Sequence, residues 1–96
     1  MKRIRFYVDT TAGNSYIVVL DKTVKPSALY VHTFNRNKTL KYAYKQIYCG
    51  YTNRIDVRRF RGKYGMTFLA ETLLNGALTN LNMPNETVKD ADYVTE

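Results

Sequence analysis

Apolar and polar residues alternate over residues 2–9 with the period of a β-strand. One face of this expected strand is apolar and carries Ile4, Phe6 and Val8. The other face is basic and aromatic and carries Arg3, Arg5 and Tyr7. A strand with this pattern buries one side against a core and leaves the other side accessible to solvent. We therefore expect residues 2–9 to begin an antiparallel sheet.

Two further strands are indicated by turn residues and β-branched runs. Gly13-Asn14 is a turn sequence, and residues 15–20 after it are rich in β-branched residues. With the preceding strand they predict an amino-terminal hairpin. Pro26-Ser27 interrupts the chain before alternation resumes over residues 28–34. A fourth strand or an extended arm is expected over residues 55–60, so the sheet should have three to four strands.

Helical spacing replaces alternation over residues 39–49. Apolar and aromatic residues there recur at intervals of three and four: Leu40, Ala43, Tyr44, Ile47, Tyr48 and Tyr51. Thr39 is a suitable N-cap, and Gly50 is a suitable residue after the last turn. We predict a helix here. A strand over the same residues is the alternative, and it would place Tyr42, Tyr44 and Tyr48 on one face.

A second helix is predicted over residues 66–81, where helical spacing persists for four turns. Its apolar positions are Met66, Leu69, Ala70, Leu73, Leu74, Ala77, Leu78 and Leu81. The opposite face carries small or neutral residues such as Thr67, Asn75 and Thr79. A solvated helix normally carries long charged residues there, so we expect a partner subunit to cover this face in a homodimer. Gly76 marks either close packing against another backbone or a tolerated glycine.

These elements predict an α+β fold in which a small antiparallel sheet packs against two helices, at about 39–49 and 66–81. A chain of 96 residues suits one small domain with a single modest core. Residues 1–82 are expected to form that domain. Residues 83–96 are acidic and poor in core-forming residues, so we expect a flexible tail there.

Charge separates the same two regions. Residues 1–81 contain fourteen Lys and Arg against four Asp and Glu, whereas residues 82–96 contain one Lys against four Asp and Glu. The formal net charge of the chain is +7. A basic body attracts nucleic acids and acidic proteins, most strongly at low salt. The alternative is that the excess of positive charge serves solubility alone.

The densest basic and aromatic stretch covers residues 58–65, with the sequence RRFRGKYG. Guanidinium groups hold phosphate oxygens in pairs, aromatic rings stack on bases, and glycines allow close approach of a backbone. We therefore predict nucleic-acid contacts from five residues: Arg58, Arg59, Arg61, Lys63 and Tyr64. The first predicted helix and the first strand would extend this surface with Lys41, Tyr42, Lys45, Arg3 and Arg5.

Gly62-Lys63-Tyr64-Gly65 resembles the GXXG loop with which KH domains clamp a nucleic-acid backbone. The resemblance covers these four residues and the start of the next helix, and it implies a phosphate-binding loop. The order of the predicted elements departs from that family, because a strand-like segment precedes the loop and a tail follows the helix. A glycine-flanked basic loop at a helix amino terminus suits a phosphate without any family relationship.

Residues with catalytic chemistry are sparse. His32 is the only histidine and Cys49 the only cysteine, so one chain forms no internal disulfide and no cysteine-based metal cluster. The carboxylates before residue 82 show no spacing that pairs two of them for general acid–base catalysis. We predict no enzymatic activity, no cofactor and no metal site. The sequence shows no secretory signal and no membrane-spanning run, so we expect a reducing, cytoplasmic location.

The pattern as a whole predicts a non-catalytic nucleic-acid-binding protein that prefers RNA or single strands. Binding by phosphate contacts and tyrosine stacking would be weakly sequence-selective and strongly salt-dependent. The alternative is a small inhibitor or adaptor of the phage or mobile-element type, which binds an acidic groove or the nucleic-acid channel of a host protein. Tyrosine and arginine are also common anchors at protein interfaces, so the sequence leaves both partners open.

Overall fold

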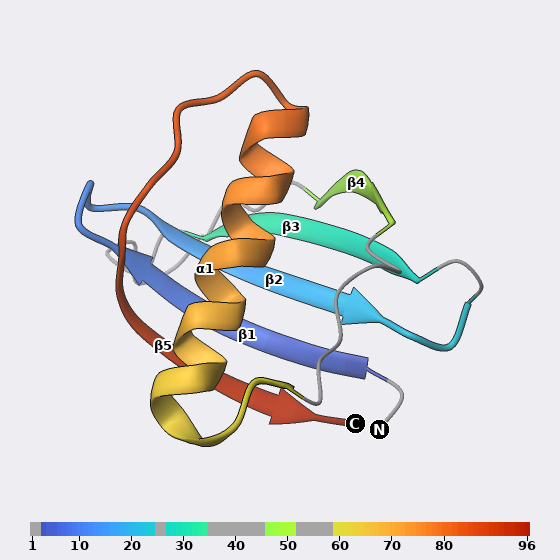
Figure 1. The fold of residues 1–96 in the computed structure, drawn as a ribbon. Coiled ribbons are helices and arrows are strands. Elements are labelled where there is room, and N and C mark those ends of the chain that lie inside the picture. Colours follow the sequence, from blue (N-terminus) through green and yellow to red (C-terminus); the bar gives the residue numbers. More distant parts are fainter. Residues whose placement is uncertain (1–2, 25–26, 35–45, 52–58) are drawn as a thin grey trace, which may run out of the picture.

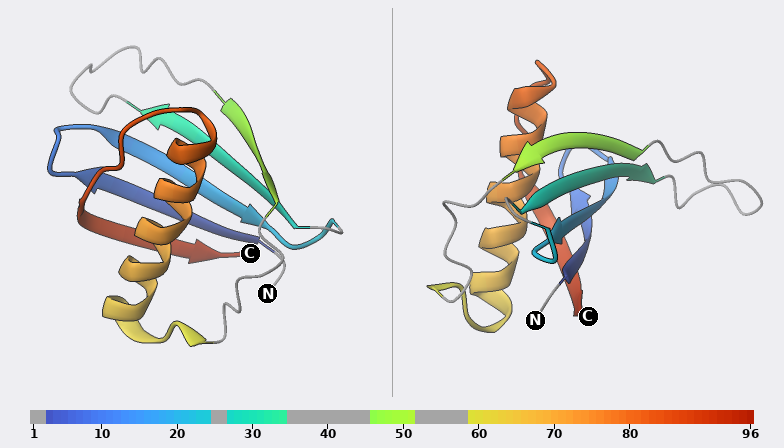
Figure 2. Two further views of the ribbon diagram at one scale, coloured as in Figure 1. Left: turned by 45° about the horizontal axis from the view of Figure 1, so that its top comes forward. Right: turned by 90° about the vertical axis from the view of Figure 1, so that its right-hand side faces the viewer.

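The computed structural model describes residues 3–24, 27–34, 46–51 and 59–96. This part of the chain contains five strands and one helix: β1 Arg3–Thr10, β2 Ser15–Asp21, β3 Ala28–Phe34, β4 Gln46–Tyr51, α1 Gly62–Asn80 and β5 Val88–Thr95. The strands form one antiparallel sheet in the order β4-β3-β2-β1-β5. The helix runs across the strands (Figure 1), and Figure 2 shows it on one side of the sheet. The predicted α+β class is confirmed.

The first three strands form the antiparallel arrangement that the alternation predicts. Phe6 of β1 faces Val18 of β2, and Val18 in turn faces Val31 of β3, so apolar residues form rows across the sheet. The turn between β1 and β2 places Gly13 at a φ of 84°, a left-handed conformation that glycine adopts without a steric penalty. The predicted hairpin and the third strand are therefore confirmed.

The core lies between α1 and the side of the sheet that faces it. Its largest fully buried side chains come from the helix and from β1, β2 and β3: Phe6, Ile4, Leu20, Leu69, Leu73, Leu74, Leu78, Val8, Val18 and Val31. The helical members follow the predicted spacing, which confirms the second helix, although α1 begins earlier than expected, at Gly62. Burial of each Leu or Phe side chain contributes about 1.5–3 kcal/mol, so this layer stabilises the fold.

The helix predicted over residues 39–49 is wrong where the structure describes it, because Gln46–Tyr51 forms strand β4. β4 pairs with the outer edge of β3, and Ile47 faces Val31. Isoleucine and tyrosine suit a pleated sheet, and β3 offers an edge to pair with, so strand pairing outweighs the helical spacing. Residues 39–45 and most of the arm predicted over residues 55–60 lie outside the described residues.

The flexible tail predicted for residues 83–96 is also wrong, because Val88–Thr95 forms strand β5. β5 lies antiparallel to β1, with Tyr93 facing Phe6 and Ala91 facing Val8. Ala91 is the one buried residue of β5, at 5% exposure, so the strand lacks the apolar alternation that would have indicated it. Backbone hydrogen bonds to β1 hold it instead. The predicted domain boundary at residue 82 therefore falls inside a single sheet-and-helix unit.

Residues 81–87 connect α1 to β5, and the polar side of the helix holds this connector. Asn75 Oδ1 accepts a hydrogen bond from the Glu86 N–H at 2.8 Å, and Asn75 Nδ2 donates to the Glu86 carbonyl at 3.0 Å. Glu71 accepts from the Val88 N–H at 2.8 Å. Part of the small, neutral face of α1 thus binds the chain's own backbone. A homodimer through α1 stays a prediction and would use the residues that the connector leaves exposed.

Gly76 lies on an exposed position of α1. A Cβ added there would meet no atom within 4 Å beyond its own helical turns. In the described part of the chain, no other backbone therefore packs closely against this glycine. Of the two interpretations of Gly76, tolerance in the helix agrees with this geometry.

Candidate nucleic-acid interface at the start of the helix

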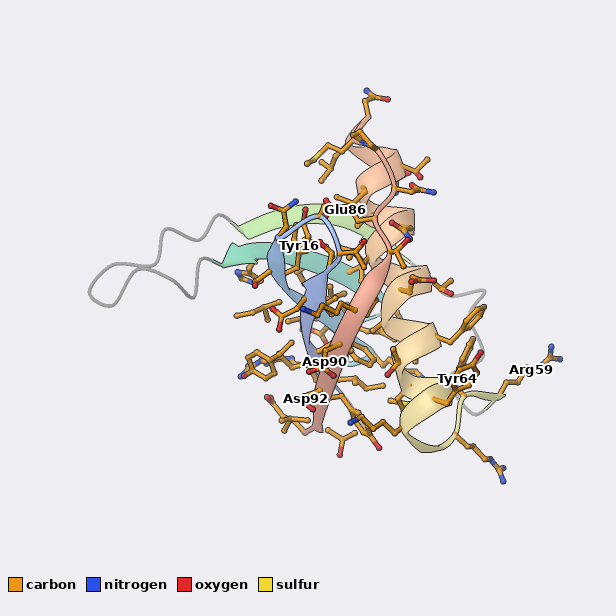
Figure 3. The ribbon with its side chains drawn as sticks, turned by 90° about the vertical axis from the view of Figure 1, so that its left-hand side faces the viewer. Tyr16, Arg59, Tyr64, Glu86, Asp90 and Asp92 are labelled. Carbon is orange, nitrogen blue, oxygen red and sulfur yellow. The ribbon has the colours of Figure 1, made fainter. Side chains whose placement is uncertain are left out.

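Four of the predicted contact residues gather where α1 begins. Arg59, Arg61, Lys63 and Tyr64 are all exposed there, and we call this set the basic helix start. Figure 3 shows Arg59 and Tyr64 on the side of α1 away from the sheet, whereas Asp90 and Asp92 lie on the sheet. Tyr64 is 88% exposed, so almost its whole side chain is available for contact.

Two glycines set the backbone of the basic helix start. Gly62, the first residue of α1, has a φ of 71°, which other residues adopt only with strain. A Cβ at Gly65 would lie 3.3 Å from the carbonyl carbon of Phe60, so glycine lets the preceding chain lie against the first turn. Gly62–Gly65 is therefore the first turn of a helix, and the resemblance to a GXXG loop does not extend to its structural context.

Two features contribute positive charge at this end of α1. Peptide dipoles and unpaired N–H groups give any helix amino terminus a partial positive charge, and the basic side chains add to it. Arg61, the N-cap residue, makes no side-chain capping hydrogen bond, and the first turn contains no acidic residue. The arrangement therefore suits an anionic ligand such as a phosphate.

Phe68 lies one turn beyond Tyr64 and extends the aromatic surface of the site. It is 55% exposed, and its ring stacks on Phe60 with centroids 6.1 Å apart and 19° between the planes. Phe60 is partly buried against the core. Sequence reasoning missed Phe68. The sequence could have identified Phe68 by its spacing of four residues from Tyr64, because side chains at this spacing are neighbours on a helix.

The structure does not bring Arg3 and Arg5 to the basic helix start. Both alternate with buried residues of β1, so they project from the sheet face that α1 does not cover, which we call the open face. Both also pair with carboxylates. Arg3 lies 3.4 Å from Asp21 and 3.9 Å from Glu96, and Arg5 lies 3.2 Å from Glu96. These carboxylates neutralise the two arginines, which therefore do not extend the predicted surface.

Four further predicted contact residues lie outside the described residues: Arg58, Lys41, Tyr42 and Lys45. The described residues hold seven Lys and Arg and seven Asp and Glu, so their formal charges cancel. The net charge of +7 therefore comes from residues 1–2, 25–26, 35–45 and 52–58. On the described surface, attraction for an anion depends on local clustering of cations and not on overall charge.

The open face contains a shallow hollow of about 310 Å³ lined by Arg3, Arg5, Val19, Asp21, Tyr30 and His32. Hydrogen bonds from Thr23, with a further contribution from Arg3, hold the pKa of Asp21 below its usual value. Burial and then the positive charge of Arg5 lower the pKa of His32. The arginines of this hollow are already paired with Asp21 and Glu96, and the lowered pKa of His32 disfavours its protonated form. We assign no ligand to it.

A second polar cluster joins the connector to the hairpin between β1 and β2, and Figure 3 shows Tyr16 beside Glu86. Glu86 accepts hydrogen bonds from the Tyr16 hydroxyl, from Thr10 Oγ1 at 2.6 Å and from Asn14 Nδ2 at 3.0 Å. Burial acts to raise the pKa of Glu86, but these hydrogen bonds lower it overall. Burial and the hydrogen bond to Glu86 raise the pKa of Tyr16. A carboxylate with three donors already bound is a structural contact and a poor general base.

Within the described part of the chain, no group of three or more His, Cys, Asp or Glu residues is placed to hold a metal ion. No helix among the same residues is both long and apolar enough to cross a membrane. Comparison of the chain with known protein families, with curated protein sequences and with solved structures gives no match. A functional assignment therefore depends on the chemistry of the basic helix start.

Proposed function

We propose that this chain binds nucleic acid, with RNA or a single strand preferred, through the basic helix start and without catalysing a reaction. The observation that supports this function is the grouping of Arg59, Arg61 and Lys63 with an exposed tyrosine at a helix amino terminus that has no acidic residue in its first turn. Cations suit the phosphates of a nucleotide, and the aromatic ring suits its base.

Phosphate contacts supply the affinity in this mechanism. A guanidinium group holds two phosphate oxygens at once, whereas the Lys63 ammonium acts as a point charge. The N–H groups of the first helical turn point towards the same anion. Each phosphate that is neutralised releases counterions, so the binding constant for a single strand falls with salt with a logarithmic slope of about −0.7 per contact.

Fluorescence anisotropy with a short labelled single-stranded RNA, measured over a range of salt concentrations, tests this function. Arg59→Gln combined with Arg61→Gln should weaken binding by about tenfold or more and reduce the salt slope. Lys22→Gln combined with Lys89→Gln is the matched control, because it removes the same charge from exposed positions elsewhere. Equal losses in the two double variants would indicate a general charge effect and contradict the site.

A second candidate is a small inhibitor or adaptor of the phage or mobile-element type that binds an acidic host protein with the same residues. The exposed ring of Phe68 favours it, because aromatic residues and arginine are enriched at protein interfaces. Purification from a lysate with and without nuclease separates the two functions. A nucleic-acid partner is lost after nuclease treatment, whereas an acidic protein partner stays bound.

A further inference from the structure

The first two turns of α1 expose two aromatic rings, those of Tyr64 and Phe68. Tyr64 is 88% exposed, and Phe68 is still 55% exposed although the ring of Phe60 stacks on it. Farther along the helix, the outward positions are polar and include Thr72 and Thr79. Aromatic surface in water is unfavourable. The helix therefore concentrates its exposed rings at the same end as its cations.

Phe68 is held in position without any ligand. Its ring stacks on Phe60, and Phe60 in turn packs against the core. Gly65 makes this possible because any larger residue would press on the Phe60 backbone. A ring that is already fixed loses little conformational entropy when another flat group stacks on its exposed side. Tyr64 completes the pair, since side chains four residues apart on a helix are neighbours, about 5–6 Å between Cβ atoms.

From this arrangement we propose that Tyr64 and Phe68 form a stacking platform for two unpaired bases, so that the basic helix start selects single strands over duplexes. The inference rests on the nucleic-acid function proposed above and adds Phe68 to its site. Arg61 and Lys63 hold phosphates while the bases turn towards the rings. In a duplex the base faces are already stacked on one another, so the two rings reach them only after the pairs open.

The cations around the platform favour a nucleic acid over an apolar protein surface. An apolar partner would cover the exposed Lys63 ammonium without offering it an anion, and burial of a charge without a partner is costly. A single strand supplies a flat base and an anionic phosphate in every nucleotide, which suits a site where the cations Arg61 and Lys63 are followed by the rings of Tyr64 and Phe68.

Binding of a labelled RNA as a single strand and as a duplex of the same length tests the platform. Tyr64→Leu combined with Phe68→Leu keeps apolar, helix-favouring side chains but removes the aromatic faces. This variant should bind the single strand roughly 5- to 100-fold more weakly and the duplex as before. Tyr64→Phe combined with Phe68→Tyr retains both rings and should recover most of the single-strand affinity that the double leucine variant loses. Circular dichroism and thermal unfolding check that both variants are folded.

A strand that contains abasic nucleotides gives a second measurement, because it keeps the phosphates and lacks the bases. The unaltered protein should bind the abasic strand more weakly than the intact strand, and the double leucine variant should bind the two equally. Equal loss of single-strand and duplex binding in the leucine variant would overturn the platform. Equal binding of abasic and intact strands by the unaltered protein would overturn it as well.

Failure of the platform is distinguishable from failure of the nucleic-acid function. If Arg59→Gln with Arg61→Gln weakens binding but the double leucine variant does not, the platform is wrong and the phosphate site stands. If the unaltered protein binds no nucleic acid, both proposals are wrong. If an acidic protein binds through the same residues in place of nucleic acid, the second candidate function replaces both.

Discussion

The two faces of the sheet are held by different interactions. The face under α1 buries apolar side chains such as Phe6 and Val18 completely, whereas the open face carries ion pairs made by Arg3 and Arg5. Burial of apolar surface is the main favourable term in folding, but partly exposed ion pairs contribute only about 0–1 kcal/mol each. The comparison teaches that the covered face determines stability, and that a basic residue on the open face is not evidence of an anion-binding site.

The basic helix start belongs to neither face. Its residues lie at the end of α1, where the side chains are exposed and the core residues begin only at Met66. Substitutions at exposed positions usually change the free energy of unfolding by less than about 0.5 kcal/mol. Changes at the basic helix start should therefore affect binding while stability stays nearly constant, which separates this region from both faces of the sheet.

The largest expected effect lies on the covered face. Phe6 is 0% exposed, and Phe6→Ala should lower the free energy of unfolding by about 3–5 kcal/mol, because it removes buried apolar area and leaves a cavity. Val94→Ala is the control, since Val94 is 48% exposed on the open face beside Arg5. It should cost less than about 0.5 kcal/mol. Urea unfolding followed by circular dichroism measures both, and similar losses would contradict the difference between the faces.

An intermediate effect is expected at Glu86, which joins the connector to the hairpin. Glu86→Gln replaces one acceptor oxygen with an amide donor, so a hydroxyl of Tyr16 or Thr10 then faces a group that cannot accept its hydrogen bond. The expected loss is about 1–3 kcal/mol. Glu96→Gln makes the same chemical change on the open face and should cost less than about 1 kcal/mol. Equal losses in urea unfolding would contradict the structural role of Glu86.

Glu86 also predicts a pH dependence of stability. Its pKa in the fold lies below the ordinary value of 4.5, so the unfolded chain binds the proton more readily than the folded chain. Glu86 therefore stabilises the fold fully above its unfolded pKa, and this contribution is lost as pH falls through the folded pKa. The difference in stability between the unaltered protein and Glu86→Gln should shrink in urea titrations at successively lower pH. A difference that stays constant would contradict the lowered pKa.

The smallest effect is expected from the ion pair between Arg5 and Glu96 on the open face. The two charged groups lie 3.2 Å apart, and their side chains are 37% and 39% exposed. A double-mutant cycle with Arg5→Gln and Glu96→Gln should give a coupling energy below about 1 kcal/mol that decreases further in high salt. A larger coupling that persists in salt would mean that the open face contributes to stability more than its exposure indicates.

How far the fold could be predicted depends on whether each element contacts the core. The strands in residues 3–34 were predictable because one side of each packs under α1, which imposes alternation. β4 was missed because its residues also fit helical spacing, and its partner edge on β3 becomes visible only in three dimensions. β5 was missed because backbone hydrogen bonds to β1 hold it, and these leave almost no apolar pattern.

The candidate site also contains some residues that could be predicted from the sequence and others that could not. Arg59, Arg61, Lys63 and Tyr64 were predictable as a group because they are adjacent in sequence and share one helix end. The separation of Arg3 and Arg5 from them was not predictable, because their partners Asp21 and Glu96 come from other parts of the chain. Phe68 was missed although two signals were present in the sequence: it lies outside the apolar series of the helix, and it is four residues from Tyr64.

The position of β5 beside β1 has a consequence for how the chain is synthesised. The ribosome completes β1 well before β5, so one edge of β1 lacks its partner while Ile4, Phe6 and Val8 are already present. An unpaired edge on an apolar strand favours pairing with other molecules, whereas the finished edge carries the charges of Lys89, Asp90 and Asp92. Nascent or truncated chains that end before residue 88 should therefore be the form most prone to aggregate.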